Sequence, residues 1–255
     1  MSSLLNTYRA EYLKLRSTAS LWWTSAVFLF LGLIVPVGFG ATTAANPTGM
    51  EGYEAMVTPD LLLGGLVVAC LPVVVVQAAM TVSTEYRFGG QALTLLATPS
   101  RIVVAVAKWL AYAVHIAVLT LLVVLVAYAV GGALIPGLTP TSFFEDGHAL
   151  TFLWTTPLSM VLLTTLTQGI ALMVRNTAGA VVLVLAWMMV LEGAVSMLPK
   201  IGAKVAEYLP FQHFQAFLGQ IPAGDWGVMH SGLYFALWAV GIWGLGFALF
   251  ARRDA

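Results

Sequence analysis

The sequence predicts an all-α membrane protein with six transmembrane helices. Only 9% of the 255 residues are charged and 60% are hydrophobic, whereas about 25% charged residues is usual in soluble domains. Apolar runs of about 20 residues, the length of a helix that crosses a bilayer, recur along the chain. They do not alternate between apolar and polar residues, as the strands of a transmembrane barrel would. We therefore expect a polytopic helical fold in a lipid bilayer.

The first 20 residues are expected to form a separate amphipathic helix lying in the membrane interface. Its apolar stripe consists of Leu4, Leu5, Tyr8, Tyr12 and Leu15, and the basic residues Arg9, Lys14 and Arg16 lie mostly off it. A helix with one apolar face and basic flanks is typical of interfacial helices. The alternative is an ordinary basic flank that fixes topology. The apolar stretch that follows is too long for a cleavable signal peptide.

A single transmembrane domain is expected over residues 21–255. Its spans are predicted at 21–40, 61–82, 102–130, 149–174, 178–198 and 228–250. We expect Pro72 to kink the second span and Ser100 to cap the third. The fourth is the richest in hydroxyl groups and also carries Gln168. Residues 199–227 hold two short apolar repeats around Pro210, each too short to span, which predicts a broken interfacial or re-entrant hairpin.

The charges indicate how the chain is oriented. With six spans both termini lie on one side, together with the basic residues Arg9, Lys14, Arg16, Arg87, Arg101, Lys108, Arg175, Arg252 and Arg253. On the other side the only basic residues are Lys200 and Lys204. Because basic residues are retained in the cytoplasm, we expect a multi-pass protein of the cell membrane with both termini cytoplasmic and the 199–227 hairpin extracytoplasmic.

One polar segment, residues 83–101, interrupts the hydrophobic part of the chain on the expected cytoplasmic side. It contains Glu85, Arg87 and Arg101, a Gly89-Gly90 break, and a helix-sized piece from Gln91 to Ala97 whose apolar residues are Leu93, Leu95 and Leu96. An exposed apolar surface flanked by charges suits docking into a groove of a partner protein. The alternative is a turn that merely joins two spans. If Glu85 and Arg87 carry coupling, they are expected to pair with each other or with Arg101.

Glu192 and its neighbourhood form the second candidate site. A carboxylate inside a span is costly, so it suggests a functional role. It could equally reach the outer interface or accept hydrogen bonds from hydroxyl groups of the fourth span. The methionine and phenylalanine side chains nearby suit either an adaptable apolar pocket or, as we favour, ordinary lipid-facing helices; they are Met188, Met189, Met197, Phe211, Phe214 and Phe217.

Several classes of activity are disfavoured by what the sequence lacks. No glycine-rich phosphate loop precedes any lysine, so the chain is not expected to bind ATP in that way. The four histidines lack ligand spacing and Cys70 is the sole cysteine, so neither a metal site nor a disulfide is expected. There is no serine-nucleophile motif. A net charge of zero gives no sign of nucleic-acid binding. We therefore predict no catalytic residues, no metal site and no cofactor within this chain.

Two stretches resemble type-two ABC exporter permeases of actinobacteria. The first is Glu11–Thr18, EYLKLRST, followed by Trp22 and Trp23 and an apolar run. The second is Thr84–Arg101, TEYRFGGQALTLLATPSR, with Lys108 shortly after it. Six spans with a broken outer hairpin before the last fit the same architecture. Where many relatives have Gly-Thr this chain has Gly89-Gly90, a departure that affects the local turn more than the role.

The resemblance implies that two permease chains, identical or different, assemble with two copies of an ABC ATPase subunit that binds ATP and Mg²⁺. The amphipathic helix, with Tyr8, Glu11, Tyr12, Lys14 and Arg16, would be the connecting helix. Gln91–Ala97 would be the coupling helix that enters a groove of the ATPase. Export of an apolar or amphipathic molecule such as a drug, lipid or peptide is the expected activity.

We expect the translocation path to be lined by residues of spans two, four and five, namely Pro72, Gln168, Met188 and Glu192. Two other classes of function stay open. A self-contained secondary transporter or channel would need polar groups at the membrane midplane and often paired repeats. A membrane enzyme or assembly factor without transport would need a catalytic constellation, which we do not find.

Overall fold

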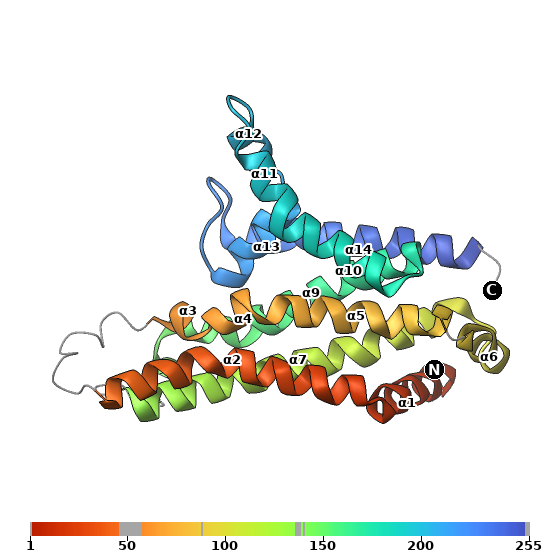
Figure 1. The fold of residues 1–255 in the computed structure, drawn as a ribbon, viewed down its shortest axis with the longest axis horizontal. Coiled ribbons are helices and arrows are strands. Elements are labelled where there is room, and N and C mark those ends of the chain that lie inside the picture. The colour runs from red at the N-terminus through yellow and green to blue at the C-terminus, as the bar shows by residue number, and fades with distance from the viewer. Residues whose placement is uncertain (1, 46–57, 88, 136–138, 140, 253–255) are drawn as a thin grey trace.

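The computed structural model describes residues 2–45, 58–87, 89–135, 139 and 141–252, and these are almost entirely helical (Figure 1). The N-terminal half comprises α1 (Ser2–Ser17), α2 (Ala19–Ala45), α3 (Pro59–Leu62), α4 (Gly64–Val68), α5 (Cys70–Arg87), α6 (Gly90–Ala97) and α7 (Arg101–Leu134). The rest comprises α8 (Ser142–Glu145), α9 (Gly147–Val174), α10 (Thr177–Ala186), the π-helical turn η2 (Trp187–Leu191), α11 (Glu192–Ser196), α12 (Gly202–Ala206), α13 (Pro210–Gly219) and α14 (Val228–Arg252). The predicted all-α class holds for the described residues, in which a single isolated bridge joins Ala223 to Trp226.

Five helical stretches are long and apolar enough to cross a membrane. They are Ala19–Thr43, Arg101–Leu134, Gly147–Val174, Thr177–Ser196 and Val228–Arg252. Each lies within a few residues of a predicted span, because an uninterrupted apolar run of this length has no better conformation in lipid than a helix. The chain is therefore a multi-pass helical membrane protein.

The second predicted span is built differently from our expectation. It is divided into α3, α4 and α5, and the chain leaves regular helix at Leu63 and Ala69. The interruption thus precedes Pro72 instead of lying at it. Pro72 stands in the first turn of α5, where a missing N–H costs nothing because that group has no partner within the helix.

Helix α9 is the centre of the bundle. It packs against α14, α7 and α5, and also against α10 and α13. Its many hydroxyl groups are compatible with burial because most donate to carbonyl groups of the same helix, as Ser159 does to Thr155 and Thr167 to Leu163, both at 2.8 Å. The hydroxyl-rich span is thus an internal scaffold with little surface of its own.

Two glycines allow α9 and α14 to approach closely. A Cβ atom added at Gly246 would lie 2.3 Å from the carbonyl oxygen of Gly169. One added at Gly169 would lie 2.6 Å from the Cα of Trp243. Small residues at a helix crossing bring the backbones into van der Waals contact, the main attraction between helices in lipid.

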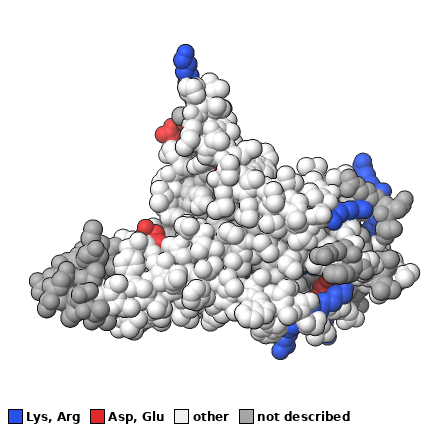
Figure 2. Space-filling model, in the orientation of Figure 1, with Lys and Arg blue, Asp and Glu red and all other residues white. Residues whose placement is uncertain are grey.

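The two ends of the bundle differ in charge. Both chain termini, α1 and α6 lie at one end, which we call the α6 end (Figure 1). Most visible Lys and Arg side chains gather there (Figure 2). Another basic group marks the tip of the projection formed by α11 and α12, where Lys200 and Lys204 lie. This agrees with the charge segregation on which the predicted orientation rests.

Candidate functional site

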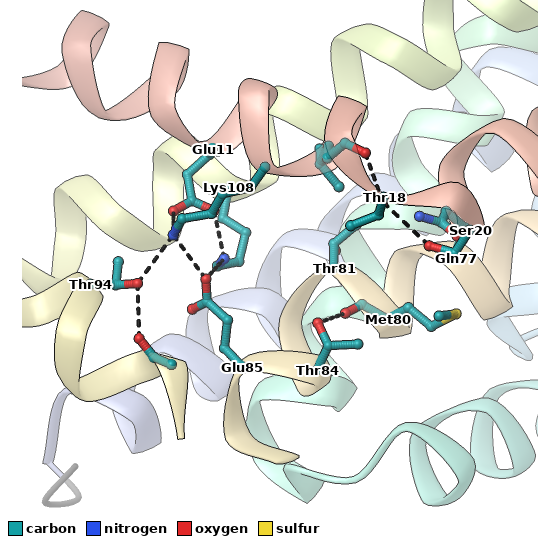
Figure 3. Close-up of a pocket in the computed structure, with 13 residues that line it drawn as sticks. Glu11, Thr18, Ser20, Gln77, Met80, Thr81, Thr84, Glu85, Thr94 and Lys108 are labelled. Atoms are coloured by element: carbon teal, nitrogen blue, oxygen red, sulfur yellow. Dashed lines mark hydrogen bonds and ion pairs between the residues drawn. The ribbon is translucent and has the colours of Figure 1, made fainter. Parts of the chain in front are cut away.

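Four charged side chains from three helices meet at the α6 end, and we call them the charge cluster. They are Glu11 of α1, Lys14 of α1, Glu85 of α5 and Lys108 of α7. Lys108 Nζ lies 2.7 Å from Glu11 Oε2 and 2.9 Å from Glu85 Oε1. Lys14 Nζ lies 2.6 Å from Glu11 Oε1 and 3.1 Å from Glu85 Oε1. Figure 3 shows Glu11, Glu85 and Lys108 converging on one point.

The inner part of the charge cluster is buried, whereas Glu85 is half-buried and Lys14 is exposed at its mouth. Glu11 is 3% exposed and Lys108 is 8% exposed. Burying such groups is costly unless each charge is paired. Two carboxylates and two ammonium groups give a formal balance of zero, so the four residues neutralise one another. Removal of Glu11 or Lys108 would leave its buried partner without full compensation, which is strongly destabilising.

Helix α1 turns a polar side toward the bundle. Among its described side chains Thr7 and Glu11 are buried, while Tyr8 and Tyr12 of the apolar stripe are half-buried and Leu5 is exposed. Tyr8 and Tyr12 stack on each other with ring centroids 6.1 Å apart. Glu11 faces inward because it neutralises the ammonium group of Lys108, which lies in the apolar helix α7. Arg16 is exposed and contributes its carbonyl group, which accepts from Trp22 Nε1 at 2.9 Å.

Lys14 experiences two opposing effects at the mouth of the cluster. Burial lowers the pKa of Lys14, but its hydrogen bond to Glu11 and the nearby charge of Glu85 raise it. The attraction prevails, and the pKa of Lys14 lies above its ordinary value. The two carboxylates therefore hold the Lys14 ammonium group in its charged form.

Helix α6 is connected directly to the charge cluster. The short helix predicted over Gln91–Ala97 is confirmed as α6, one residue longer at its start. Lys14 Nζ donates to Thr94 Oγ1 at 3.1 Å, and Thr94 donates back to the carbonyl of Gly90 at 3.1 Å. Gly89 precedes α6 with a φ of 67°, a left-handed conformation that glycine adopts without strain.

The exposed surface of α6 is apolar where it can be described. Leu96 is 79% exposed and Leu95 is half-buried. The side chains of Arg87, Gln91 and Leu93, which we also assigned to this surface, lie outside the described residues. An exposed leucine beside an ion-paired anchor is a suitable contact for another protein.

Arg101 has different partners from those we predicted. Its guanidinium donates to the carbonyl oxygens of Phe250 at 2.9 Å and Ala251 at 3.3 Å, and lies 5.8 Å from the Phe250 ring centroid. These carbonyls belong to the last turn of α14, where helical carbonyl groups lack partners within the helix. Arg101 thus ties α7 to the C-terminal end of α14, while the lysines of the charge cluster neutralise Glu85.

Glu192 caps another helix instead of reaching the surface. Its Oε1 accepts from the N–H of Phe211 and its Oε2 from the N–H of Gln212, both at 2.8 Å. These donors lie in the first turn of α13, where N–H groups need outside acceptors and the helix dipole favours an anion. Glu192 itself is 1% exposed and directly follows η2.

The other residues of the predicted translocation path have separate surroundings. Gln168 is 1% exposed and donates from Nε2 to Thr81 Oγ1 at 2.9 Å. Met188 is half-buried in η2. Phe211, Phe214 and Phe217 are buried, so the expectation that they face lipid is wrong; α13 packs them against α14 and α9. Met189 and Met197 are exposed, as lipid-facing residues are expected to be.

Sequence reasoning did not identify Lys108 as a partner of Glu11 and Glu85. The usable signal was a lysine inside a predicted span, which by itself indicates a functional or paired charge. Among the described residues no group of three or more His, Cys, Asp or Glu side chains is arranged to hold a metal ion.

Comparison with known proteins gives a family but no activity. A family model described as "Protein of unknown function (DUF2705)" matches residues 28–255. The match includes Glu85 and Lys108, whereas Glu11 and Lys14 precede it. No curated protein matches the chain.

Proposed function

We propose that this chain, which belongs to the DUF2705 family of proteins of unknown function, is the membrane-spanning permease subunit of an ATP-driven exporter. In this proposal α3, α4 and α5 together form the second of six spans along the chain. The α6 end and both termini are cytoplasmic. The hairpin of α12 and α13 is then extracytoplasmic. A separate ABC ATPase binds ATP and Mg²⁺, and two permease chains complete the transporter in the cell membrane.

The observation that carries the proposal is the attachment of α6. This short helix exposes Leu96 on one side and is joined through Thr94 and Lys14 to two carboxylates, the buried Glu11 and the half-buried Glu85. A push on α6 would therefore reach α1, α5 and α7 together, because the charge cluster contains residues of all three. A surface turn that served only as a spacer would need neither the buried charges nor their connection to α6.

Contacts between α5 and α10 support a route for movement to the opposite end. Ser83 Oγ lies 2.8 Å from Thr177 Oγ1, and the Arg175 guanidinium lies 5.0 Å from the Tyr86 ring centroid. Helix α10 continues through η2 into α11, where Glu192 holds the first turn of α13. Transport requires that these contacts differ in energy between inward-open and outward-open states.

The test is co-purification with an ATPase, and the candidates are ABC ATPases encoded in the same genome. Leu96→Asp places a charge on the exposed surface of α6 and is expected to abolish co-purification. Met197→Asp is the matched control, because Met197 is 84% exposed on the projection of α11 and α12. Retention of the ATPase by Leu96→Asp at the level of the control would refute docking through α6.

A second measurement separates docking from coupling. Glu85→Ala is expected to retain the ATPase but to lose most substrate-stimulated ATP hydrolysis in proteoliposomes, because the charge cluster no longer joins α5 to α1. Wild-type hydrolysis and transport by this variant would show that residues 83–101 are a spacer.

A further inference from the structure

A cavity of about 490 Å³ adjoins the charge cluster at the α6 end (Figure 3). Its walls come from α1, the beginning of α2, α5, α6 and α7. Leu15 and Met80 supply apolar surface, while Thr18, Ser20, Gln77 and Thr84 supply uncharged polar groups. The cavity is large enough for part of a small amphiphile, since ligand sites commonly start at about 300 Å³.

Gln77 is the strongest indication that the cavity receives a polar ligand. The residue is 2% exposed, and its Oε1 accepts from Thr24 Oγ1 at 3.3 Å. Its Nε2 has no hydrogen-bond partner among the described residues. Gln77 lines the cavity, and an amide donor without a protein partner binds water or a ligand. A side-chain amide with two free donors in the wall of a cavity is thus suited to hydroxyl or carbonyl oxygens of a bound molecule.

The charges beside the cavity argue for a ligand without net charge. Glu11 and Glu85 balance Lys14 and Lys108, and all four residues line the cavity. An ion of either sign would meet two ammonium groups and two carboxylates, so it would gain no net counter-charge. Its loss of hydration would therefore not be offset. A neutral molecule would leave the four ion pairs intact.

The position of the cavity specifies the rest of the ligand. It lies between the amphipathic α1 and the apolar helices α2 and α5. An interfacial helix lies where lipid headgroups meet acyl chains, so the cavity is at the depth of an amphiphile's headgroup. We propose that this cavity binds an electrically neutral amphiphile whose headgroup carries hydroxyl or amide groups. Two sources could supply such a ligand, namely a transported amphiphile or a neutral glycolipid of the bilayer.

The binding test needs no partner ATPase, so its result is independent of the proposed transport role. The purified chain in phosphatidylcholine nanodiscs is titrated with radiolabelled n-decyl β-glucoside. Decyltrimethylammonium and decyl sulfate, with the same chain length, serve as charged competitors. We expect saturable binding and at least about five-fold weaker competition by either ion, the factor that one hydrogen bond commonly contributes.

Variants locate the site. Gln77→Met removes the amide at similar volume and is expected to weaken glucoside binding at least about five-fold. Ser20→Phe fills the cavity and is expected to abolish binding. Ser196→Phe, the same substitution at an exposed position outside the cavity, is the control. Unchanged binding by Ser20→Phe, or equal competition by all three headgroups, would overturn the proposal.

A final comparison identifies the source of the ligand. Nanodiscs are prepared with and without monoglucosyl diacylglycerol. Displacement of decyl glucoside by the glycolipid supports the site and assigns it to a membrane lipid. Saturable binding that the glycolipid does not affect supports the site and assigns it to a smaller cargo molecule. Absence of saturable binding in both preparations overturns it.

Discussion

The carboxylate of Glu192 accepts a hydrogen bond from the backbone N–H of Phe211 at 2.8 Å, although 19 positions of the sequence separate the two residues. The same carboxylate also accepts from Gln212. One side chain thus joins α11 to the start of α13 and determines how the segment between them is held. Glu192 is explained as a positioning residue without any contact with a transported molecule.

Replacement of Glu192 is expected to loosen this hairpin. In Glu192→Ala two N–H groups of α13 lose their acceptor, and the free energy of unfolding should fall by about 1–3 kcal/mol. Limited proteolysis between α11 and α13 in detergent should become faster. Glu207→Gln, which changes an exposed carboxylate in the same hairpin, is the control and should be cleaved at the wild-type rate. Cleavage of Glu192→Ala at the wild-type rate would show that this cap does not hold the hairpin.

The charge cluster should be sensitive to the loss of a single member. Lys108→Met leaves two carboxylates with one lysine, which should lower the free energy of unfolding by about 3–5 kcal/mol. In the double variant Lys108→Met/Glu85→Gln the charges balance again, so part of the loss should be recovered. Lys204→Met, an exposed lysine, is the control. Thermal unfolding in detergent measures all four proteins, and a double variant no more stable than Lys108→Met would contradict pairing.

The raised pKa of Lys14 predicts a dependence on alkaline pH. A lysine whose folded pKa lies above its unfolded value of 10.5 stabilises the protein fully below that value and loses the contribution as pH rises through the folded pKa. The stability difference between wild type and Lys14→Met should therefore shrink above about pH 10.5. Lys14→Arg stays charged and should keep its advantage over Lys14→Met. A difference that does not change with pH would exclude this contribution.

The contact between α9 and α14 gives a prediction with an internal control. Gly246→Ala places a methyl group against the Gly169 carbonyl and should separate the helices, with a cost of about 1–3 kcal/mol. Gly244→Ala adds the same methyl group where no atom lies within 4 Å. Its stability should match or exceed that of wild type. Comparable melting temperatures for the two variants would refute close packing at Gly246.

Helix positions were the part of the fold most accessible to sequence reasoning. An apolar run near 20 residues forms a helix in lipid whatever surrounds it, because every backbone polar group must be satisfied within the segment. For this reason 149–174 and 228–250 were predicted almost as they occur in α9 and α14. In the second span the interruption at Leu63 precedes the pair Gly64-Gly65, a signal that we did not use, whereas the interruption at Ala69 has no glycine or proline beside it.

Side-chain partners followed from packing alone. Lys108 and Glu11 are 97 residues apart, and neither sequence neighbourhood indicates the other. Likewise, the sequence offered Arg101 as a partner of Glu85 or Arg87, but its guanidinium donates to carbonyl groups at the end of α14. The sequence by itself determined the helical membrane class, the segregation of charge and the short α6. The tertiary structure decided which charges neutralise each other and which helix Glu192 caps, because those interactions depend on distances between segments that only packing brings together.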